Sequence, residues 1–329
     1  MGWMLSKFRL PVLSTVPRSG TWFLRYAVSY LCHLERGGRI EDAATGRLLG
    51  SPEGPSFGYD RFKGGPLFRV RGTLPYDHLF IGHAVCPGFA ETAGAVDWWT
   101  DTRFHVRGYD YFHEGLDYRR TPVDLADYIN ARVNVRALER SASKGRAAPI
   151  ALVYRNPIDQ AASYFRYCQE HRDPTYSLFQ GRPLVGMEFR DYLVSAALPS
   201  YAKQFISFQE MARRHPHLVK LVSYERLMED PVTVLGELLD HLAGAPRKRP
   251  FLADAVWLAR RDHMKEVERK LGRSLDGTRT GLGSHMRAKR SETPLNEALV
   301  AETVALLRSQ GVDTALFDWP VAKRTASAA

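Results

Sequence analysis

The sequence has few cysteines and no long apolar run. Its three cysteines, Cys32, Cys86 and Cys168, are far apart and form no C-x-x-C pair. They predict neither a disulfide framework nor a zinc site, and a reduced, cytoplasmic location fits them best. No window approaches the roughly 20 apolar residues that a membrane span needs. At the N-terminus, Lys7 and Arg9 interrupt the apolar residues, so we expect no signal peptide.

Acidic residues are fewer than basic ones. The chain has 46 Lys and Arg against 36 Asp and Glu, a formal net charge of +10. Such an excess favours an anionic partner, such as nucleic acid, an acidic membrane or a polyphosphorylated cofactor. The basic residues are scattered, apart from short clusters at 247–249 and 287–290, and form no long basic arm. Nucleic acid is therefore the weaker of these alternatives, although charge alone leaves it open.

Apolar periodicity predicts that strands and helices alternate along the chain. The predicted strands span residues 8–16, 78–85, 150–154 and 218–223. The predicted helices span residues 22–34, 122–140, 157–168, 187–214, 231–243, 251–271 and 294–309. The glycine- and proline-rich residues 37–78 are expected to be mostly loop. This order predicts an α/β fold with a central parallel sheet flanked by helices. We expect a single domain over residues 1–329, with a flexible tail after residue 323.

A glycine-containing turn follows the first predicted strand. Residues 16–22 read VPRSGTW and lead directly into a helix. The backbone N–H groups of such a turn and the dipole of the helix N-terminus bind anions, and Arg18 adds a full charge. The second glycine and the lysine of the GxxxxGK[ST] loop of NTPases are absent. Alone, the motif fits a simple strand-to-helix turn equally well.

A second motif ends the strand at 150–154. Arg155 follows this strand, and Ser163 lies eight residues later on the next helix. Ligands of parallel sheets bind at the carboxyl ends of the strands, where an arginine and a hydroxyl suit a phosphate. Alone, the motif more often means a helix cap at Asn156 and a structural ion pair of Arg155.

The two motifs together resemble those of the sulfotransferases that use 3′-phosphoadenosine-5′-phosphosulfate (PAPS). VPRSGTW resembles the family's 5′-phosphosulfate loop, PKSGTTW. LVYRNPIDQAAS, residues 152–163, resembles its 3′-phosphate motif. SYERLMEDP, residues 223–231, is similar to its YEDL-x-x-DP segment. All three occur in the family's order. The resemblance covers roughly residues 7–290 and implies a P-loop-like fold, PAPS as the donor and adenosine 3′,5′-bisphosphate (PAP) as the product.

The resemblance assigns roles residue by residue in the first motif. Arg18 corresponds to the family lysine that reaches the phosphosulfate bridge. Ser19, Gly20, Thr21 and Trp22 correspond to the loop residues that donate hydrogen bonds to the 5′-phosphate. Trp22 stands where the family has a second threonine, so one side-chain hydrogen bond to phosphate is in doubt. The resemblance does not decide whether the ring of Trp22 or that of Phe23 stacks on the adenine.

The later motifs supply the rest of the implied donor site. Arg155 and Ser163 correspond to the 3′-phosphate pair, and Tyr224 to the tyrosine beside the adenine. Met264 stands where the family often has a methionine near the base. The family's late basic motif is degraded to residues 287–290, RAKR, in which Arg287 and Lys289 are the candidates to close over the 3′-phosphate.

A histidine general base is also implied by the resemblance. The family places one at a strand end, and His83 in the segment 79–85 fits by position, although the flanking K-x-H-L-P context is not reproduced. A histidine in an apolar strand is more often a satisfied core residue. His105 and His113 are weaker rivals. No metal ion is required in principle, since cationic side chains and N–H groups can stabilise the transferred group.

The segment at about 84–148 is an aromatic-rich insertion. Aromatic residues at this density suit the wall of an acceptor pocket, a satellite core or a contact in a homo-oligomer. A small molecule, sugar, lipid or peptide would fit as acceptor, through a hydroxyl or an amine. We expect neither a membrane span nor a nucleic-acid partner.

Two alternatives from other classes remain at this stage. A small-molecule kinase would share the P-loop-like fold, but the Gly-Lys-[Ser/Thr] ending that serves Mg²⁺ is absent. A basic polyanion- or nucleic-acid-binding protein with a degenerate nucleotide site would suit the net charge. The intact spacing of Arg155 and Ser163 opposes it.

Overall fold

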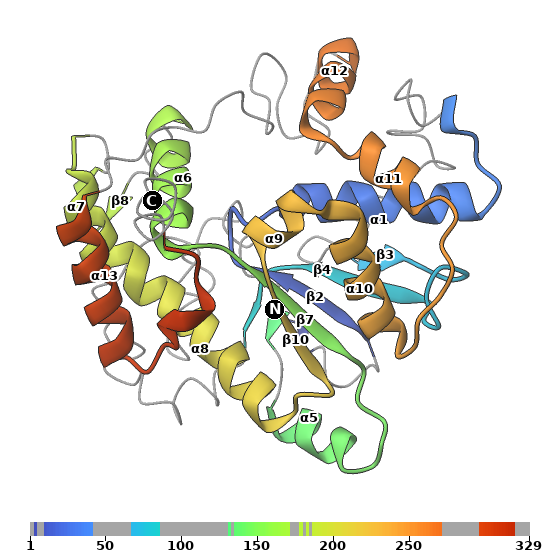
Figure 1. Cartoon of the computed structure of the whole chain (residues 1–329), viewed down its shortest axis with the longest axis horizontal. Helices are drawn as coiled ribbons and strands as arrows, with labels where there is room; N and C mark the ends of the chain where they lie inside the picture. Colours follow the sequence, from blue (N-terminus) through green and yellow to red (C-terminus); the bar gives the residue numbers. More distant parts are fainter. Residues whose placement is uncertain are drawn as a thin grey trace, which may run out of the picture.

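The computed structural model describes residues 3–4, 10–41, 67–85, 131–132, 135–171, 178–179, 182–183, 186–271 and 296–319. A five-stranded sheet in the order β10-β7-β2-β4-β3 forms its centre (Figure 1). The strands are β2 (Val12–Thr15), β3 (Leu67–Arg69), β4 (His78–Gly82), β7 (Ile150–Tyr154) and β10 (Val219–Ser223). All pairs are parallel except β3 with β4, so the carboxyl ends of β2, β4, β7 and β10 share one edge.

The helices connect and cover these strands. They are α1 (Thr21–Glu35), α5 (Val135–Ala142), α6 (Pro157–His171), α7 (Phe189–Tyr192), α8 (Leu198–Arg214), α9 (Tyr224–Glu229), α10 (Pro231–Ala243), α11 (Leu252–Leu258), α12 (Arg261–Leu271) and α13 (Glu297–Ser309). A π-helical stretch, Leu193–Ala197, joins α7 to α8. Short strands form two smaller sheets, β1 (Trp3–Met4) with β6 (Ala131–Arg132) and β5 (Ala84–Val85), and β8 (Leu178–Phe179) with β9 (Arg182–Pro183).

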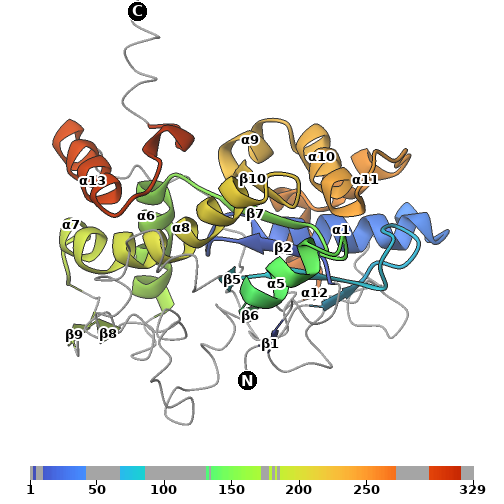
Figure 2. The same ribbon diagram turned by 90° about the horizontal axis from the view of Figure 1, so that it is seen from below.

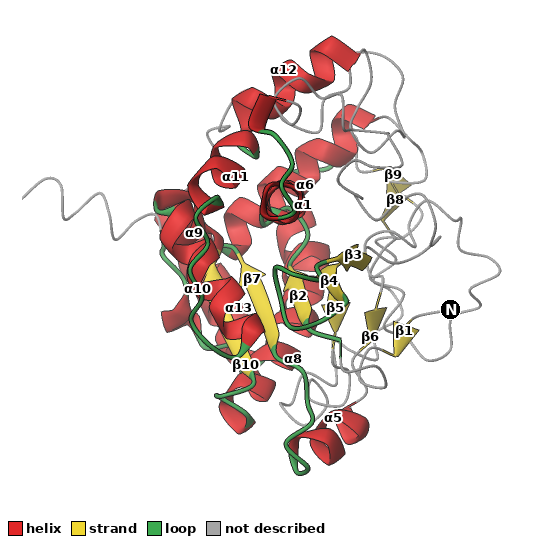
Figure 3. Cartoon of the chain, turned by 90° about the vertical axis from the view of Figure 1, so that its right-hand side faces the viewer, coloured by secondary structure: helices red, strands yellow, loops and turns green. Residues whose placement is uncertain are grey.

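Alternate side chains of the central strands enter two separate cores. Val12, Ile150 and Leu152 pack with α6, α8 and α13 on one face. Leu13 and Val153 pack with α1, α10 and α11 on the other. Figures 1 and 2 show these two helical layers on opposite sides of the sheet, and Figure 3 shows the strands of the sheet side by side. Burial of both faces explains why β7 is apolar throughout, without polar alternation.

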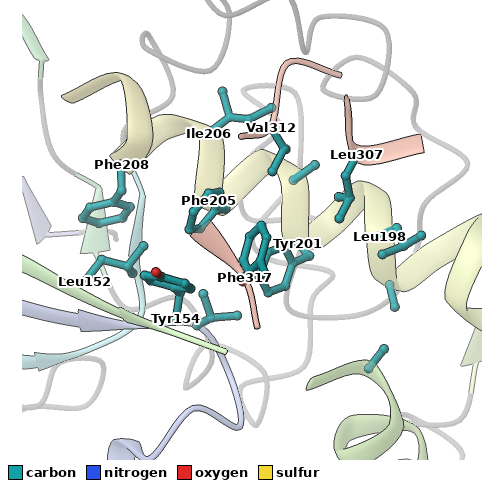
Figure 4. Close-up of a cluster of buried hydrophobic side chains, with 14 of the residues drawn as sticks. Leu152, Tyr154, Leu198, Tyr201, Phe205, Ile206, Phe208, Leu307, Val312 and Phe317 are labelled. Carbon is teal, nitrogen blue, oxygen red and sulfur yellow. The ribbon is translucent and has the colours of Figure 1, made fainter. Parts of the chain in front are cut away.

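An aromatic cluster fixes the end of β7. The Tyr154 ring packs edge-on against Phe205 of α8, with centroids 5.1 Å apart, and against Phe317, at 5.5 Å (Figure 4). The Tyr154 hydroxyl donates a hydrogen bond to the Leu316 carbonyl at 2.8 Å. Because Arg155 follows directly, this cluster holds the backbone from which its guanidinium extends.

Some sequence predictions about the elements were wrong. The predicted helix over 122–140 contains β6, and its last turns belong to α5, which begins only at Val135. The predicted strand 78–85 breaks at His83 into β4 and β5, which pair in different sheets. Within 37–78 the prediction of loop missed β3. Most of the aromatic-rich segment and the tail after 323 lie outside the described residues. No helix in the described part of the chain is long and apolar enough to cross a membrane.

Candidate active site

The loop between β2 and α1 is built on left-handed backbone. Arg18 has φ 68° and Gly20 has φ 84°, and the Ser19 N–H donates to the Val16 carbonyl at 3.1 Å. A Cβ on Gly20 would also lie only 3.0 Å from Cε2 of the Tyr224 ring. Glycine is therefore required here for its φ angle and for the close approach of Tyr224. The loop leads directly into the N-terminus of α1, and a helix N-terminus is a place where backbone N–H groups bind anions.

Side chains at the start of α1 are buried and polar. Ser19 is completely buried, and its Oγ has no hydrogen-bond partner among the described residues. The Thr21 hydroxyl lies 2.7 Å from that of Thr15, the last residue of β2. Nε2 of Gln160 on α6 donates to the Pro17 carbonyl at 3.0 Å and braces the loop from the other side. Burying a hydroxyl without a hydrogen-bond partner costs free energy of folding, so the Ser19 hydroxyl is a candidate to donate to a bound ligand.

Arg155 extends from the carboxyl end of β7 onto this loop. Its Nη1 donates to the Arg18 carbonyl at 3.3 Å, and its Cζ lies 5.0 Å from the centroid of the Tyr224 ring. Its backbone carbonyl accepts a 2.6 Å hydrogen bond from the Tyr201 hydroxyl. Its Nε is buried and unpaired within the described part of the chain. The guanidinium is thus held by backbone and ring contacts, and these leave its buried Nε without a partner among the described residues.

Helix α6 adds the next group. The Asn156 side chain caps it, with Oδ1 accepting from the N–H groups of Ile158 and Asp159 at 3.0 and 3.4 Å. Ser163, two turns along, accepts a 3.2 Å hydrogen bond from Nε of Arg18. Two motifs 145 residues apart in the chain therefore meet at one edge of the sheet, as their positions after parallel strands predict.

The segment after β10 closes the site. Tyr224 is the first residue of α9, and its ring lies between Gly20 and the Arg155 guanidinium. The next residue, Glu225, accepts a hydrogen bond from the Asn156 N–H at 3.1 Å. Burial raises the pKa of the Glu225 carboxyl, and N–H groups and Arg155 oppose that rise. Tyr224 thus joins the first two motifs, and in this structure its ring supports Arg155.

His83 lies where the chain leaves β4 for β5. Its side chain is 6 % exposed. Nδ1 lies 2.7 Å from the Thr15 carbonyl and 3.1 Å from the Thr15 hydroxyl. A carbonyl can only accept, so Nδ1 carries the proton and Nε2 is the basic nitrogen. Burial lowers the pKa of His83 to about 3, the hydrogen bond to Thr15 raises it, and the positive charge of Arg25 lowers it.

Thr15 links His83 to the loop at residues 16–20 and to the start of α1. Its hydroxyl contacts both His83 and Thr21, and its carbonyl accepts from His83 and from Nε2 of Gln204, the latter at 3.2 Å. Gln204 also donates to the Ala84 carbonyl at 3.2 Å. One buried network therefore fixes the geometry of the loop relative to the histidine.

Trp22 and Arg25 pack along α1. The Arg25 guanidinium carbon lies 5.0 Å from the centroid of the Trp22 ring, and its Nε donates to the Ile81 carbonyl at 3.2 Å. The Trp22 ring also packs against Tyr26, with centroids 5.7 Å apart. Trp22 is half-buried, and its indole packs against these two side chains of its own helix.

Of the remaining predicted residues, only Met264 belongs to the described part of the chain. Arg287, Lys289, His105 and His113 lie outside the described residues. Met264 on α12 is completely buried, and its sulfur lies 3.6 Å from the Tyr30 hydroxyl of α1. Its environment is a core contact between two helices. Among the described residues, no group of three or more His, Cys, Asp or Glu side chains is arranged to hold a metal ion.

The sequence analysis missed the buried polar residues that support the site. These residues hold other parts of the site in place through hydrogen bonds to backbone carbonyls or side chains. They are Thr15, Gln160, Tyr201 and Gln204. One signal was available. Gln160 and Gln204 lie on helices with many apolar residues, and a glutamine that such a helix buries needs a hydrogen-bond partner.

Comparison with known proteins agrees with this geometry. A family model for the sulfotransferase domain matches residues 117–287, just over half of the chain. The chain belongs to the sulfotransferase family. The match includes Arg155, Ser163 and Tyr224, whereas the loop at 16–22 and His83 precede it. The P-loop-like α/β fold expected from the resemblance is confirmed by the parallel sheet and its flanking helices.

Solved sulfotransferase structures share low sequence identity with this one. A retinol dehydratase in complex with androsterone and inactive cofactor PAP is 15 % identical, with a TM-score of 0.46, over 95 % of this chain and 83 % of that chain. Mouse sulfotransferase SULT7A1 complexed with PAP is 15 % identical, with a TM-score of 0.39, over 87 % of this chain and 95 % of that one. No curated protein sequence matches significantly.

Proposed function

We propose that this sulfotransferase moves a sulfuryl group from PAPS to an acceptor hydroxyl or amine, with His83 as the general base. The observation that carries the proposal is the convergence of the anion-binding loop at Arg18 with Arg155, Ser163 and His83 at the carboxyl ends of three parallel strands. Each motif alone fits a structural role. Their meeting at one sheet edge favours a ligand with more than one anionic group.

The residues present fit the two phosphates of the donor. Ser19 Oγ and Arg155 Nε are buried donors without partners among the described residues, one on each motif. We assign the 5′-phosphosulfate to Arg18 and to the N–H groups and hydroxyls of residues 19–22. The 3′-phosphate is assigned to Arg155 and Ser163, and the adenine side to Tyr224. PAPS would supply the activated sulfuryl group; the protein supplies positive charge and N–H donors, which stabilise developing negative charge without reorganisation.

His83 suits the role of a proton acceptor by its tautomer. The Thr15 carbonyl holds the proton on Nδ1, so Nε2 is the basic nitrogen of the neutral ring. Its depressed pKa keeps the imidazole neutral over the whole physiological range. The link through Thr15 and Thr21 fixes this nitrogen relative to the loop.

The direct test is turnover with labelled PAPS over a panel of phenol, sugar, lipid and peptide acceptors. One parallel reaction contains PAPS together with EDTA. A second contains ATP with Mg²⁺ in place of PAPS. We expect label transfer from PAPS to at least one acceptor class, undiminished by EDTA. Phosphoryl transfer from ATP that depends on Mg²⁺, with no transfer from PAPS, would indicate a kinase instead.

A further inference from the structure

A third arginine lies at the cluster formed by Arg18 and Arg155. Arg166 is on α6, three residues after Ser163, and residues at this spacing lie on the same face of a helix. Its Nε donates to the Ala162 carbonyl at 3.2 Å, four residues earlier. That contact turns the side chain back toward the N-terminus of α6. This is the end of the helix at which Arg155 and the Asn156 cap lie.

The charges around Arg166 are mostly of its own sign. Burial lowers the pKa of the Arg166 guanidinium, and the nearby charges of Arg155 and then Arg18 lower it further. Asp159 opposes these effects only in part. Arginine stays protonated in proteins, so the cost is one of repulsion. An anion that lies among these three guanidinium groups would relieve their mutual repulsion.

Two features of the neighbours indicate where that anion binds. Arg155 has a buried Nε without a partner among the described residues. Ser163, on the same helix face as Arg166, already contacts Arg18 through its hydroxyl. Both are residues assigned above to the 3′-phosphate. Arg166 therefore belongs to the 3′-phosphate side of the site rather than to the 5′ loop.

We propose that Arg166 is a third ligand of the donor's 3′-phosphate, beside Arg155 and Ser163, and that it helps to select a 3′-phosphorylated nucleotide. The proposal rests on the proposed function. Arg166 of α6 would thus supply a positive charge beside the 3′-phosphate, a role for which the sequence suggested Arg287 and Lys289.

Calorimetric titration of purified protein with PAP and with adenosine 5′-phosphate tests this role. Arg166→Gln should weaken PAP binding by roughly 10- to 100-fold, the effect of losing one hydrogen bond to a charged group. Affinity for adenosine 5′-phosphate, which lacks the 3′-phosphate, should change by less than about twofold, the scale of a remote charge. Arg166→Lys should retain part of the affinity for PAP, because a point charge replaces the planar fork.

Arg213→Gln is the charge-matched control. Arg213 is exposed near the end of α8, where the chain approaches the amino end of β10, and it pairs with Glu210. The Arg213→Gln variant should bind both PAP and adenosine 5′-phosphate with wild-type affinity. If the wild-type protein binds PAP and Arg166→Gln binds it equally well, or loses both nucleotides equally, the role of Arg166 is overturned and the proposed function stands. A wild-type protein that does not bind PAP overturns both.

Discussion

Arg155 is held in place before any ligand binds. The Arg18 carbonyl, the Tyr224 ring and the hydrogen bond of the Tyr201 hydroxyl to its own carbonyl fix its backbone and guanidinium. A preorganised guanidinium loses little conformational entropy on binding and presents two donors in a fixed plane to an oxyanion. Its buried Nε has no partner among the described residues, so this donor is available to a ligand.

Arg155→Ala should therefore weaken PAPS binding by about 2–5 kcal/mol, the usual cost of truncating one partner of a buried, hydrogen-bonded charge pair. Arg155→Lys should recover only part of that loss. Calorimetry with PAP, on variants shown by circular dichroism to be folded, measures the effect. An alanine variant with wild-type affinity would place the phosphate elsewhere.

His83 combines two properties that set its chemistry. The proton on Nδ1 is fixed by Thr15, and burial lowers its pKa to about 3. A group whose pKa is depressed is protonated only as the pH falls through that low value. The basic form is therefore fully present from neutral pH down to well below pH 6.

This gives a prediction about rate and pH. For the wild-type enzyme, kcat/KM should be nearly constant from about pH 8 to 5.5, whereas a base with an ordinary pKa of ~6.5 would lose roughly tenfold by pH 5.5. His83→Asn should reduce turnover by about 10²–10⁴-fold at saturating PAPS, with PAP affinity unchanged. His78→Asn, on the exposed start of β4, is the control. Near wild-type turnover of a folded His83→Asn variant would mean that His83 only fills the core.

At the scale of the elements, the site depends on how one loop joins β2 to α1. Gly20 begins α1 with left-handed backbone and lies against Tyr224. A side chain there would push the ring off the position in which it supports Arg155. The loop, α9 and the end of β7 therefore act as one unit.

Gly20→Ala should destabilise the fold and weaken PAP binding at the same time. Left-handed backbone costs a non-glycine residue about 1–2 kcal/mol, and the 3.0 Å contact adds displacement of the Tyr224 ring. Gly37→Ala is a matched control, because Gly37 has the same φ of 84° and its added Cβ would meet none of the described atoms within 4 Å. Thermal unfolding should show a lower melting temperature for both variants, with the larger decrease for Gly20→Ala. Only Gly20→Ala should lose PAP affinity, and equal affinities would contradict the role of Tyr224.

The parts predictable from the sequence are those with strong local patterns. The buried strand at 150–154 and the helix after the VPRSGTW loop agree with β7 and α1 within one or two residues, because apolar runs and breaks mark their ends. β3 is a three-residue antiparallel edge strand in a glycine-rich region, and its pairing with β4 has no local signal. The division of 78–85 at His83 likewise depends on β6, which is distant in the sequence.

The candidate site divides in the same way. Arg18, Arg155, Ser163 and Tyr224 were predicted from motif order, and the structure brings them together. The contacts of Thr15 and Gln204 depend on a helix that crosses the strand ends, which no linear pattern indicates. The role of each of these residues in binding or catalysis is still a prediction, and their positions in the structure support it.

At the scale of the whole molecule, the net charge of +10 is spread over the chain, and the site uses a small part of it. Charge alone favours anions of any kind, including nucleic acid. We propose instead that the cluster of Arg18, Arg155 and Ser163 binds one kind of ligand, a nucleotide with phosphates at both its 3′ and 5′ positions. Selectivity between nucleotides therefore distinguishes a donor site from a basic surface.

The most direct test compares PAP with adenosine 5′-phosphate in calorimetric titrations of the wild-type protein at fixed salt. Two or more hydrogen bonds to the 3′-phosphate, at about 1.5–3 kcal/mol each, predict that PAP binds roughly 100-fold more tightly or better. Equal affinity for the two nucleotides would contradict a 3′-phosphate pocket at Arg155 and Ser163, and with it the use of PAPS by this enzyme.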